Sequence, residues 1–584
     1  MNGKIIRYLL LFIFVLFGFR FGCHEALHGL DASWAYALND IHDKGTYIFG
    51  KDVFFTFGPL GYLLQPFCCR EIVIQAFIFK MAIIIAFIFS LFCFRKRKNS
   101  NIFIALIVLN FVCFGYDMFE FLAVMLAMVC LFAKNRVRYS GLILLNLLAC
   151  FMLFAKFNIG ITCIATLIFT IIASRFKKEF VLVSLTIWAA GLLLITYFYF
   201  GSLSILLNWF KVSFTIASGY SEAMLMQLHG LNVFYLAAAL TVLGLYLSLW
   251  IDDYKNNAKY SKVFLILLPS MFFMFKSGFV RADMHMMLFF TYILAVVPVL
   301  YFFVKNVSVK KLIIMYILAL ILPIRHISPG CVLSFISELK HGKEIYTTNE
   351  YLLPADWVRD TNKTKIEFLP FDFGYIKKNK IIAHYNPILQ LYSVYTQELD
   401  RISAADYMEQ QTDFIVIDRN ESIDGRNMIL DNPATWDAIR ENYYVKDFKS
   451  NKILLAKKTK RVSYTYKTFE KGFYKINEDI FVPKRAKKAV VNLELSLIGG
   501  GANFLFKLLP LYMYINYNDN ETVKLRVVRD VMKNGIYVDE LVLTLNDLDN
   551  WLRGKETLKN INSIKFYTVL PFLYKKNILI EWQK

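Results

Sequence analysis

Four charged side chains stand out because each lies next to an apolar run that is long enough, or nearly long enough, to cross a membrane. Asp31 follows the first run, in the stretch "HGLDASWAYALNDIHDKG". Asp117 and Glu120 lie in "GYDMFE", and Lys156 lies in "AKFN". Carboxylates can act as general bases or bind a divalent cation, and an ammonium group can bind a phosphate oxygen. These residue types therefore predict acid–base chemistry and anion binding near a membrane surface.

A denser group of charged side chains occurs in the stretch "FKSGFVRADMH". It contains Lys276, Arg281, Asp283 and His285, at the entrance of the next apolar run. Charges inside or against a membrane are costly, so their concentration at one end of a run is informative. This group favours a bound ligand with negative charge.

Each of these residues also has a structural explanation. The spacing of Trp34, Leu38 and Ile41 predicts a short amphipathic helix lying on a membrane, and Asp31 alone could cap that helix. The acids of "GYDMFE" could be solvated helix ends, and the basic residues could reach the lipid headgroups or form an ion pair. Because all these groups fall on one side of the predicted membrane, we favour a shared site.

The composition indicates which elements carry these residues. Of the 584 residues, 57% are apolar and 17% are aromatic, and the mean hydropathy is +0.46, which excludes an ordinary soluble globular protein. About eleven apolar runs predict a polytopic α-helical membrane protein. The runs lie near residues 5–22, 72–94, 101–115, 119–133, 139–155, 159–174, 180–200, 231–251, 263–277, 285–304 and 312–328.

Basic residues between the runs predict the orientation of the spans. The formal net charge is +21, and much of it lies in short clusters such as "RKRK" from Arg95 and "RFKK" from Arg175. Every second connection is basic, so the positive-inside rule assigns these connections and the N-terminus to the cytoplasm. The clusters are therefore topology signals, and no nucleic-acid partner is expected. The first run is expected to be an uncleaved helix, and everything after Ile327 is expected to lie outside.

Changes in composition predict three regions. Residues 1–330 form a transmembrane domain with a long outer loop at 23–71 and a half-apolar outer segment from Ser202 to Gly230, which is expected to be re-entrant or interfacial. Residues 331–460 form an α/β subdomain, with buried strands in "TDFIVID" and "NKILLAKK" around a helix in "PATWDAIRENY". Residues 461–584 contain short predicted strands, including "KAVVNLELSLI" and "GIYVDELVLTL", which favour a β-sandwich.

The nine cysteines carry no metal or disulfide signature. None lies in the polar C-terminal region, and no pair has zinc-ligand spacing with histidines. We therefore expect neither a disulfide framework nor a structural metal.

This arrangement resembles the GT-C superfamily of membrane glycosyltransferases, which includes the protein O-mannosyltransferases, the catalytic subunits of oligosaccharyltransferases and the aminoarabinose transferases. Members have many spans, an acid just after the first helix, a second acidic motif between the third and fourth spans, and commonly a C-terminal outer domain. Here "LDASW" provides Asp31, and "GYDMFE" provides Asp117 and Glu120 as D-x-x-E where many members have D-x-D. "FTFGPLG" and "NPILQLYSVYT" resemble stretches of bacterial membrane proteins, so the expected location is the bacterial cytoplasmic membrane.

The resemblance implies transfer of a sugar from a polyprenyl-phosphate donor to a glycan, lipid or protein acceptor outside the cytoplasmic membrane, with inversion at the anomeric carbon. Asp31 would act as the general base that takes the proton of the acceptor hydroxyl. A divalent cation, Mg²⁺ or Mn²⁺, would bind Asp117 and Glu120 if the reaction uses one.

Basic side chains would bind the phosphate of the donor lipid as it leaves. Lys156 and Arg281 are the expected donor-phosphate ligands, with Lys276 or His285 assisting. Asp283 would orient Arg281. Membrane lipids are the other expected partners.

Other functions remain open from the sequence. A transporter or flippase of lipid-linked glycans would also collect charges at span ends, although it should place ionisable groups nearer the midplane of the membrane. A glycan polymerase or ligase with a lipid diphosphate donor fits the same pattern. A non-catalytic assembly protein needs far fewer spans for anchoring.

Overall fold

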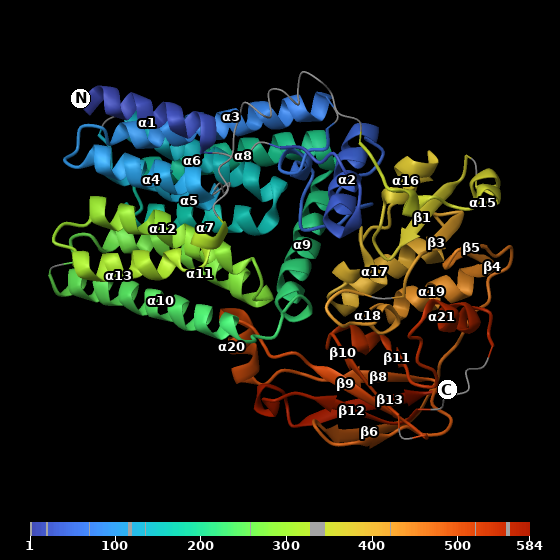
Figure 1. Cartoon of the computed structure of the whole chain (residues 1–584). Coiled ribbons are helices and arrows are strands. Elements are labelled where there is room, and N and C mark those ends of the chain that lie inside the picture. The colour runs from blue at the N-terminus through green and yellow to red at the C-terminus, as the bar shows by residue number, and fades with distance from the viewer. Residues whose placement is uncertain are drawn as a thin grey trace. The chain divides into compact units, whose positions relative to one another are not determined.

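The chain is described by a computed structural model, which contains apolar helices together with three β-sheets in its C-terminal region (Figure 1). It describes residues 3–18, 22–68, 70–114, 119–134, 136–256, 258–326, 345–361, 363–420, 422–519, 521–555 and 561–584. The chain divides into two compact units. The helical unit comprises Met1–Glu25, Phe57–Gly201 and Leu228–Glu344, and the mixed unit comprises Ala26–Thr56, Ser202–Gln227 and Ile345–Lys584.

The helical unit is built from apolar helices, and each apolar run expected from the sequence overlaps one of them, although the runs 5–22 and 312–328 extend beyond α1 and α13. The helices are α1 (Gly3–Phe17), α3 (Arg70–Cys93), α4 (Ser100–Phe114), α5 (Phe119–Phe132), α6 (Arg136–Ala155), α7 (Phe157–Ala173), α8 (Lys178–Ile195), its continuation η2 (Thr196–Phe200), α10 (Leu231–Lys255), α11 (Ser261–Arg281), α12 (Met286–Phe303) and α13 (Val309–Leu320), with the short turns η1 (Gly61–Leu63) and η3 (Pro323–His326). Among the described residues, six helices are long and apolar enough to cross a membrane, as judged by length and composition: α3, α6, α8 with η2, α10, α11 and α12.

Burial distinguishes the central from the peripheral helices of this unit. In α12, 83% of the most apolar stretch is buried, whereas in α8 the corresponding share is 11%. Leu182, Leu185 and Leu193 of α8 are exposed. A helix that is apolar on all sides is buried in protein or faces lipid. We therefore take α12 as the core of the helical unit and α8 as a helix of the lipid-facing type.

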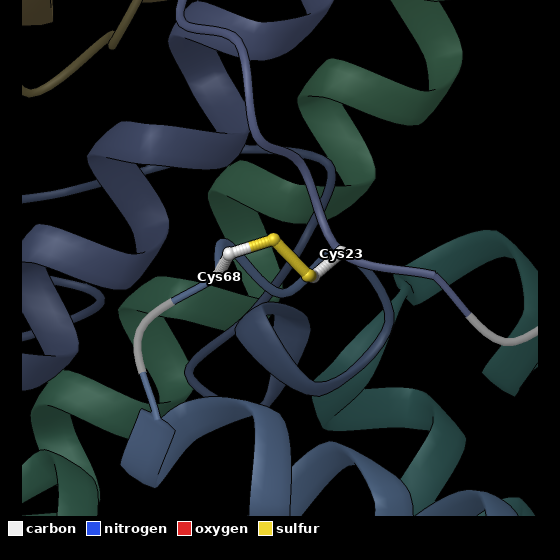
Figure 2. The surroundings of a disulfide bond; sticks show 2 residues. All are labelled: Cys23 and Cys68. Atoms are coloured by element: carbon white, nitrogen blue, oxygen red, sulfur yellow. A yellow bond between two sulfur atoms is a disulfide. The ribbon is translucent and has the colours of Figure 1, made fainter. Parts of the chain in front are cut away.

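A disulfide bond joins Cys23 to Cys68, which lie between α1 and α3 near the two ends of the segment 23–71 (Figure 2). The expectation that the cysteines form no disulfide is therefore wrong. The two segments run side by side, and the backbone N–H of His24 donates to the carbonyl of Pro66 at 2.8 Å. Because the two cysteines are 45 residues apart, no local spacing marks them as a pair. The other cysteines in the described ranges are free and lie in helices α3 to α7: Cys93, Cys113, Cys130, Cys150 and Cys163.

The mixed unit contains a five-stranded sheet in the order β2-β1-β3-β5-β4. Strand β1 pairs in parallel with β2 and β3, and β5 pairs antiparallel with β3 and β4. The predicted strands in "TDFIVID" and "NKILLAKK" and the helix in "PATWDAIRENY" are confirmed. The elements are η4 (Asn349–Tyr351), α15 (Ala355–Asp360), β1 (Lys365–Leu369), α16 (Gly374–Asn379), β2 (Ile382–Ala383), η5 (Leu391–Ser393), α17 (Gln397–Met408), β3 (Phe414–Ile417), α18 (Met428–Asp431), α19 (Pro433–Asn442), β4 (Tyr443–Lys449) and β5 (Lys452–Lys457).

Two helices from early in the sequence also belong to the mixed unit. They are α2 (Gly29–Lys44) and α9 (Leu203–Ala223). Val212 and Ile216 of α9 lie in one buried cluster with Leu399 of α17. The segment expected to be re-entrant or interfacial is thus a helix with one apolar face packed on the mixed unit.

Two antiparallel four-stranded sheets form the C-terminal part, in the orders β10-β9-β12-β7 and β11-β8-β13-β6. "GIYVDELVLTL" pairs as a strand only at its start, because Val542 and Leu545 pack into the core of the five-stranded sheet with Ile415. The elements are β6 (Thr468–Lys475), β7 (Ile480–Phe481), β8 (Lys488–Asn492), α20 (Leu497–Leu505), β9 (Tyr512–Tyr517), β10 (Thr522–Arg526), η6 (Val531–Asn534), β11 (Ile536–Tyr537), α21 (Leu545–Leu552), β12 (Ile561–Tyr567), η7 (Pro571–Leu573) and β13 (Asn577–Gln583).

Candidate functional site

Asp31 lies in the first turn of α2 and does not cap that helix. The capping position is His28, and its side chain makes no capping hydrogen bond. The Asp31 side chain is exposed, and its Oδ1 accepts a hydrogen bond from Trp34 Nε1 at 3.0 Å. A negative charge in the first turn is favourable because it faces the positive end of the helix dipole. The structure therefore presents an accessible carboxylate at the start of α2.

The start of α2 also lines a polar pocket of about 340 Å³ that lies entirely within the mixed unit. Its other walls include the segments that follow β1 and β3, where Asp372 and Asp418 are located, together with η4 and the turn from β4 to β5. Ligands of open α/β sheets bind beyond the carboxyl ends of neighbouring parallel strands, and β1 and β3 are such neighbours. Gly29 lines the pocket, whereas Asp31, two residues later and about 200° around the helix, is not among the residues that line it.

Tyr351 connects the start of α2 to the sheet edge. Its hydroxyl donates to Asp372 Oδ2 at 2.9 Å, accepts from the backbone N–H of Gly29 at 3.2 Å, and lies 3.1 Å from Nδ1 of His28. The hydroxyl of Ser33, also on α2, donates to Asp372 Oδ1 at 3.1 Å. Burial raises the pKa of Asp372 above its usual value, although the hydrogen bond from Tyr351 lowers it. A buried carboxyl group is thereby held at the pocket wall by two segments far apart in the chain.

A second carboxylate at the pocket is paired with arginine. Arg419 donates from Nε and Nη2 to the two oxygens of Asp418, each at 3.0 Å, and Tyr375 donates its hydroxyl to the same carboxylate at 3.0 Å. The guanidinium carbon lies 5.0 Å from the ring centre of Phe371. The hydrogen bond to Asp418 raises the pKa of Arg419, so this group stays charged.

The pocket lining is almost balanced in charge and offers both donors and acceptors. Glu350, Asp372 and Asp418 are acidic, and Arg419 and Lys452 are basic. A small anion would meet more carboxylates than cations, whereas a neutral ligand with many hydroxyl groups can bond to both kinds. The rings of Tyr351 and Tyr375 are almost fully buried, so the pocket offers a ligand mainly its polar groups. The arrangement therefore suits a neutral ligand with several hydroxyl groups.

In the helical unit, Arg281, Asp283 and His285 lie together between α11 and α12. Arg281 Nε donates to Asp283 Oδ2 at 3.0 Å, and His285 Nδ1 lies 2.5 Å from Asp283 Oδ1. Burial alone would raise the pKa of Asp283, but the hydrogen bonds from the His285 side chain and backbone and from Arg281 hold it well below the usual range. Asp283 thus remains ionised and fixes the direction of Arg281, which is the arrangement an orienting residue requires.

The other predicted residues of the helical unit are more dispersed. Lys276 is half-buried in α11, and its position is about 140° around the helix from that of Arg281. Lys156 precedes α7, and its ammonium nitrogen lies 4.7 Å from the ring centre of Phe57. Glu120 is buried in the first turn of α5.

Asp117, the other acid of the D-x-x-E motif, lies outside the described residues. Asp31 belongs to the mixed unit, and the remaining predicted site residues that are described belong to the helical unit.

Sequence reasoning missed a buried acid–histidine cluster in the mixed unit. His384 Nε2 lies 2.8 Å from Asp406 Oδ2, and Tyr407 donates its hydroxyl to Glu367 at 2.5 Å. One possible ligand atom from each of Glu367, His384 and Asp406 lies within 4.8 Å of the others, and this is the one such group in the described part of the chain. Burial raises the pKa of Glu367 well above its usual value. The His384–Asp406 and Tyr407–Glu367 contacts make part of a buried hydrogen-bonded network, while Oε2 of Glu367 and Nδ1 of His384 are buried without a hydrogen-bond partner among the described residues.

The residues of the pocket and of this cluster are brought together by folding over long sequence separations. His28 and Tyr351 are 323 residues apart. The available sequence signal was the acids that directly follow buried strands, as Asp418 follows "FIVI". No protein-family model, curated protein or solved structure matches this chain.

Proposed function

We propose that the protein is an integral membrane glycosyltransferase, which moves a sugar from a polyprenyl-phosphate donor to an acceptor on the outer face of the cytoplasmic membrane. The observation that carries the proposal is the position of Asp31. Its exposed carboxylate lies in the first turn of α2, and the first residue of that helix, Gly29, lines a pocket of about 340 Å³ that the Asp31 side chain itself does not line. A general base next to a pocket for a hydroxyl-bearing acceptor is what glycosyl transfer requires.

In this proposal, the acceptor saccharide occupies the pocket and its reacting hydroxyl approaches Asp31. The carboxylate takes the hydroxyl proton while the oxygen attacks the anomeric carbon of the donor. The bond from that carbon to the phosphate oxygen breaks, and polyprenyl phosphate leaves with the electron pair. Attack opposite the leaving group inverts the configuration at the anomeric carbon.

The leaving phosphate carries two negative charges when fully ionised and needs cationic partners. Arg281 is the main candidate because Asp283 holds its guanidinium group in place at 3.0 Å. Lys156, Lys276 and His285 are the assisting candidates. Glu120 is the described member of the acidic pair that a divalent cation would use, and none of the steps above is routed through a metal.

The disulfide between Cys23 and Cys68 supports the proposed orientation. Disulfides persist in oxidising compartments outside the cytoplasm and are rare inside it. The first outer loop, with Asp31 between the two cysteines, is assigned to that same side by the basic connections. Both properties support the outer face as the side of the proposed reaction.

The donor site is tested by identifying the lipids that co-purify with the full chain in mild detergent. We expect mass spectrometry to detect a polyprenyl phosphate or its glycosylated form with the wild type, and about tenfold less with Arg281→Ala, because a charge-assisted bond to phosphate is lost. Arg359→Ala is the matched control, since Arg359 is exposed on α15 of the mixed unit. Ordinary phospholipids alone, with no difference between variants, would reject a polyprenyl-phosphate donor.

A further inference from the structure

The C-terminal part of the mixed unit carries an exposed apolar surface that the proposed reaction does not use. It is formed by α20 and the neighbouring segment around η7 and is called the α20 patch. Leu497 is 97% exposed, and the other members are between 58% and 69% exposed. Its members are Leu497, Ile498, Phe504, Leu505, Val569 and Phe572.

The patch is built into the fold. Ser496 begins α20, and its hydroxyl donates to the carbonyl of Phe572 at 2.8 Å while accepting from the backbone N–H of Gly499 at 3.1 Å. A Cβ atom at Gly499 would lie 1.8 Å from the carbonyl oxygen of Leu573, so only glycine permits this close approach. The helix therefore packs with Gly499 inward and its large apolar side chains outward, which is the reverse of an ordinary surface helix.

The α20 patch is held by a hydrogen bond close to the segment that leads into α10. Lys507, two residues after α20, donates from Nζ to the carbonyl of Met226 at 2.8 Å. Met226 precedes Leu231, where α10 begins, by five residues. Five residues of fully extended chain span about 17 Å at most. Because α10 has the length and composition of a membrane span, a bilayer lies within reach of this segment.

We propose that the α20 patch inserts into the interfacial region of the membrane that the same chain crosses. A helix with large apolar side chains on its outer face lies in the boundary between headgroups and acyl chains. Lys576 is exposed three residues after η7 and can contact anionic headgroups, whereas Lys575 beside it forms an ion pair with Glu494. The bilayer is the occupant that best fits this patch for two reasons. The chain from Met226 to α10 is short, and the membrane interface offers acyl chains to the apolar residues and anionic headgroups to the neighbouring lysine. The inference does not depend on the proposed reaction.

Depth-dependent fluorescence quenching tests this inference on the full chain. An environment-sensitive fluorescent amino acid is placed at position 504, and the protein is reconstituted into vesicles of phosphatidylcholine and phosphatidylglycerol that contain lipids spin-labelled near the top of the acyl chain. The matched control is the same probe at position 473, because Phe473 on β6 of the same unit is 74% exposed. We expect quenching at 504 to exceed quenching at 473 by at least about threefold, since interfacial helices bury their apolar face in this layer.

Equal quenching at the two positions would overturn the inference. Energy transfer between probes at position 504 on two copies, without lipid quenching, would also overturn it and would assign the patch to self-association. A second variant, Leu497→Ser with Leu505→Ser, keeps the helix and removes two apolar side chains. In this variant the lipid quenching at 504 should fall, while the emission at 473 stays unchanged.

Discussion

The hydroxyl group of Tyr351 is a hydrogen-bonding partner of both α2 and the sheet edge. Removing it in Tyr351→Phe leaves Asp372 with one hydrogen bond fewer in a buried position. We expect the free energy of unfolding of the mixed unit to fall by about 1–3 kcal/mol. The measurement is thermal unfolding of the full protein in detergent, followed by tryptophan fluorescence. Tyr444→Phe is the control, because Tyr444 is exposed on β4, and an equal effect of both changes would refute the role of Tyr351.

Asp400 makes the stability of the mixed unit depend on pH. The side chain is fully buried, and burial raises its pKa to about 6 although Ala434, Asn534 and Thr435 donate hydrogen bonds to it. A carboxyl group whose pKa is raised on folding favours the folded state most below its ordinary pKa of 3.8 and loses that contribution as the pH rises to about 6. The loss amounts to about 3 kcal/mol, at about 1.4 kcal/mol for each pKa unit.

The pH dependence is measured with Asp400→Asn, which cannot ionise. The difference in unfolding temperature between this variant and the wild type should shift in favour of the variant between pH 4 and pH 6.5. A difference that stays constant over this range would show that Asp400 does not titrate in the folded protein as described.

At the scale of elements, Gly219 permits the close contact between α9 and the segment that precedes α17 in the mixed unit. A Cβ atom there would lie 2.7 Å from Cβ of Tyr395 and 2.9 Å from Cγ2 of Thr396. Gly219→Ala should therefore lower the free energy of unfolding of the mixed unit by about 1–3 kcal/mol through overpacking. Gly244→Ala in α10 is the control, since no atom lies within 4 Å of the added methyl group. Thermal unfolding of the two variants side by side checks this, and an unchanged Gly219→Ala protein would contradict it.

The sequence predicts the helical elements well and some of the C-terminal strands poorly. Long uninterrupted apolar runs leave few alternatives to a helix, so α3 and α12 were predictable. The predicted strand "KAVVNLELSLI" ends at Asn492 because Ser496 caps α20 four residues later. In "GIYVDELVLTL", the later apolar residues pack into the core of the five-stranded sheet without pairing as a strand. The same alternation of apolar residues suits a paired strand and an unpaired segment of this kind.

The candidate site could be predicted only in part. Asp31 and the Arg281–Asp283 pair were found because charge is rare next to apolar runs. The pocket was not found, because its walls come from segments that are brought together only when α2 packs on the sheet. The cysteine pair was missed for the same reason, since contact between residues 45 positions apart is a property of the fold.

At the scale of the whole molecule, the mixed unit is assembled from three separate parts of the chain. Residues 26–56 and 202–227 supply α2 and α9, which pack on apolar residues of α17, η5, η6 and the segments between the strands. A fragment of residues 345–584 alone lacks both helices and exposes part of that core. We expect this fragment to aggregate in size-exclusion chromatography, while the full chain in detergent stays monodisperse. A monomeric fragment with a cooperative thermal transition would contradict this description of the unit.

The central claim is that Asp31 is the base of a sugar transfer from a lipid phosphate. The most direct measurement is the single-turnover transfer of the co-purified lipid-linked sugar to a panel of added saccharides, compared between the wild type, Asp31→Asn and Asp43→Asn. Asp43 is also exposed on α2 and controls for loss of a surface charge on that helix. We expect Asp31→Asn to retain the donor lipid but to transfer the sugar at least about 100-fold more slowly, because general-base catalysis contributes at least that much, while Asp43→Asn transfers at the wild-type rate. Transfer by Asp31→Asn at the wild-type rate would show that Asp31 is not the base.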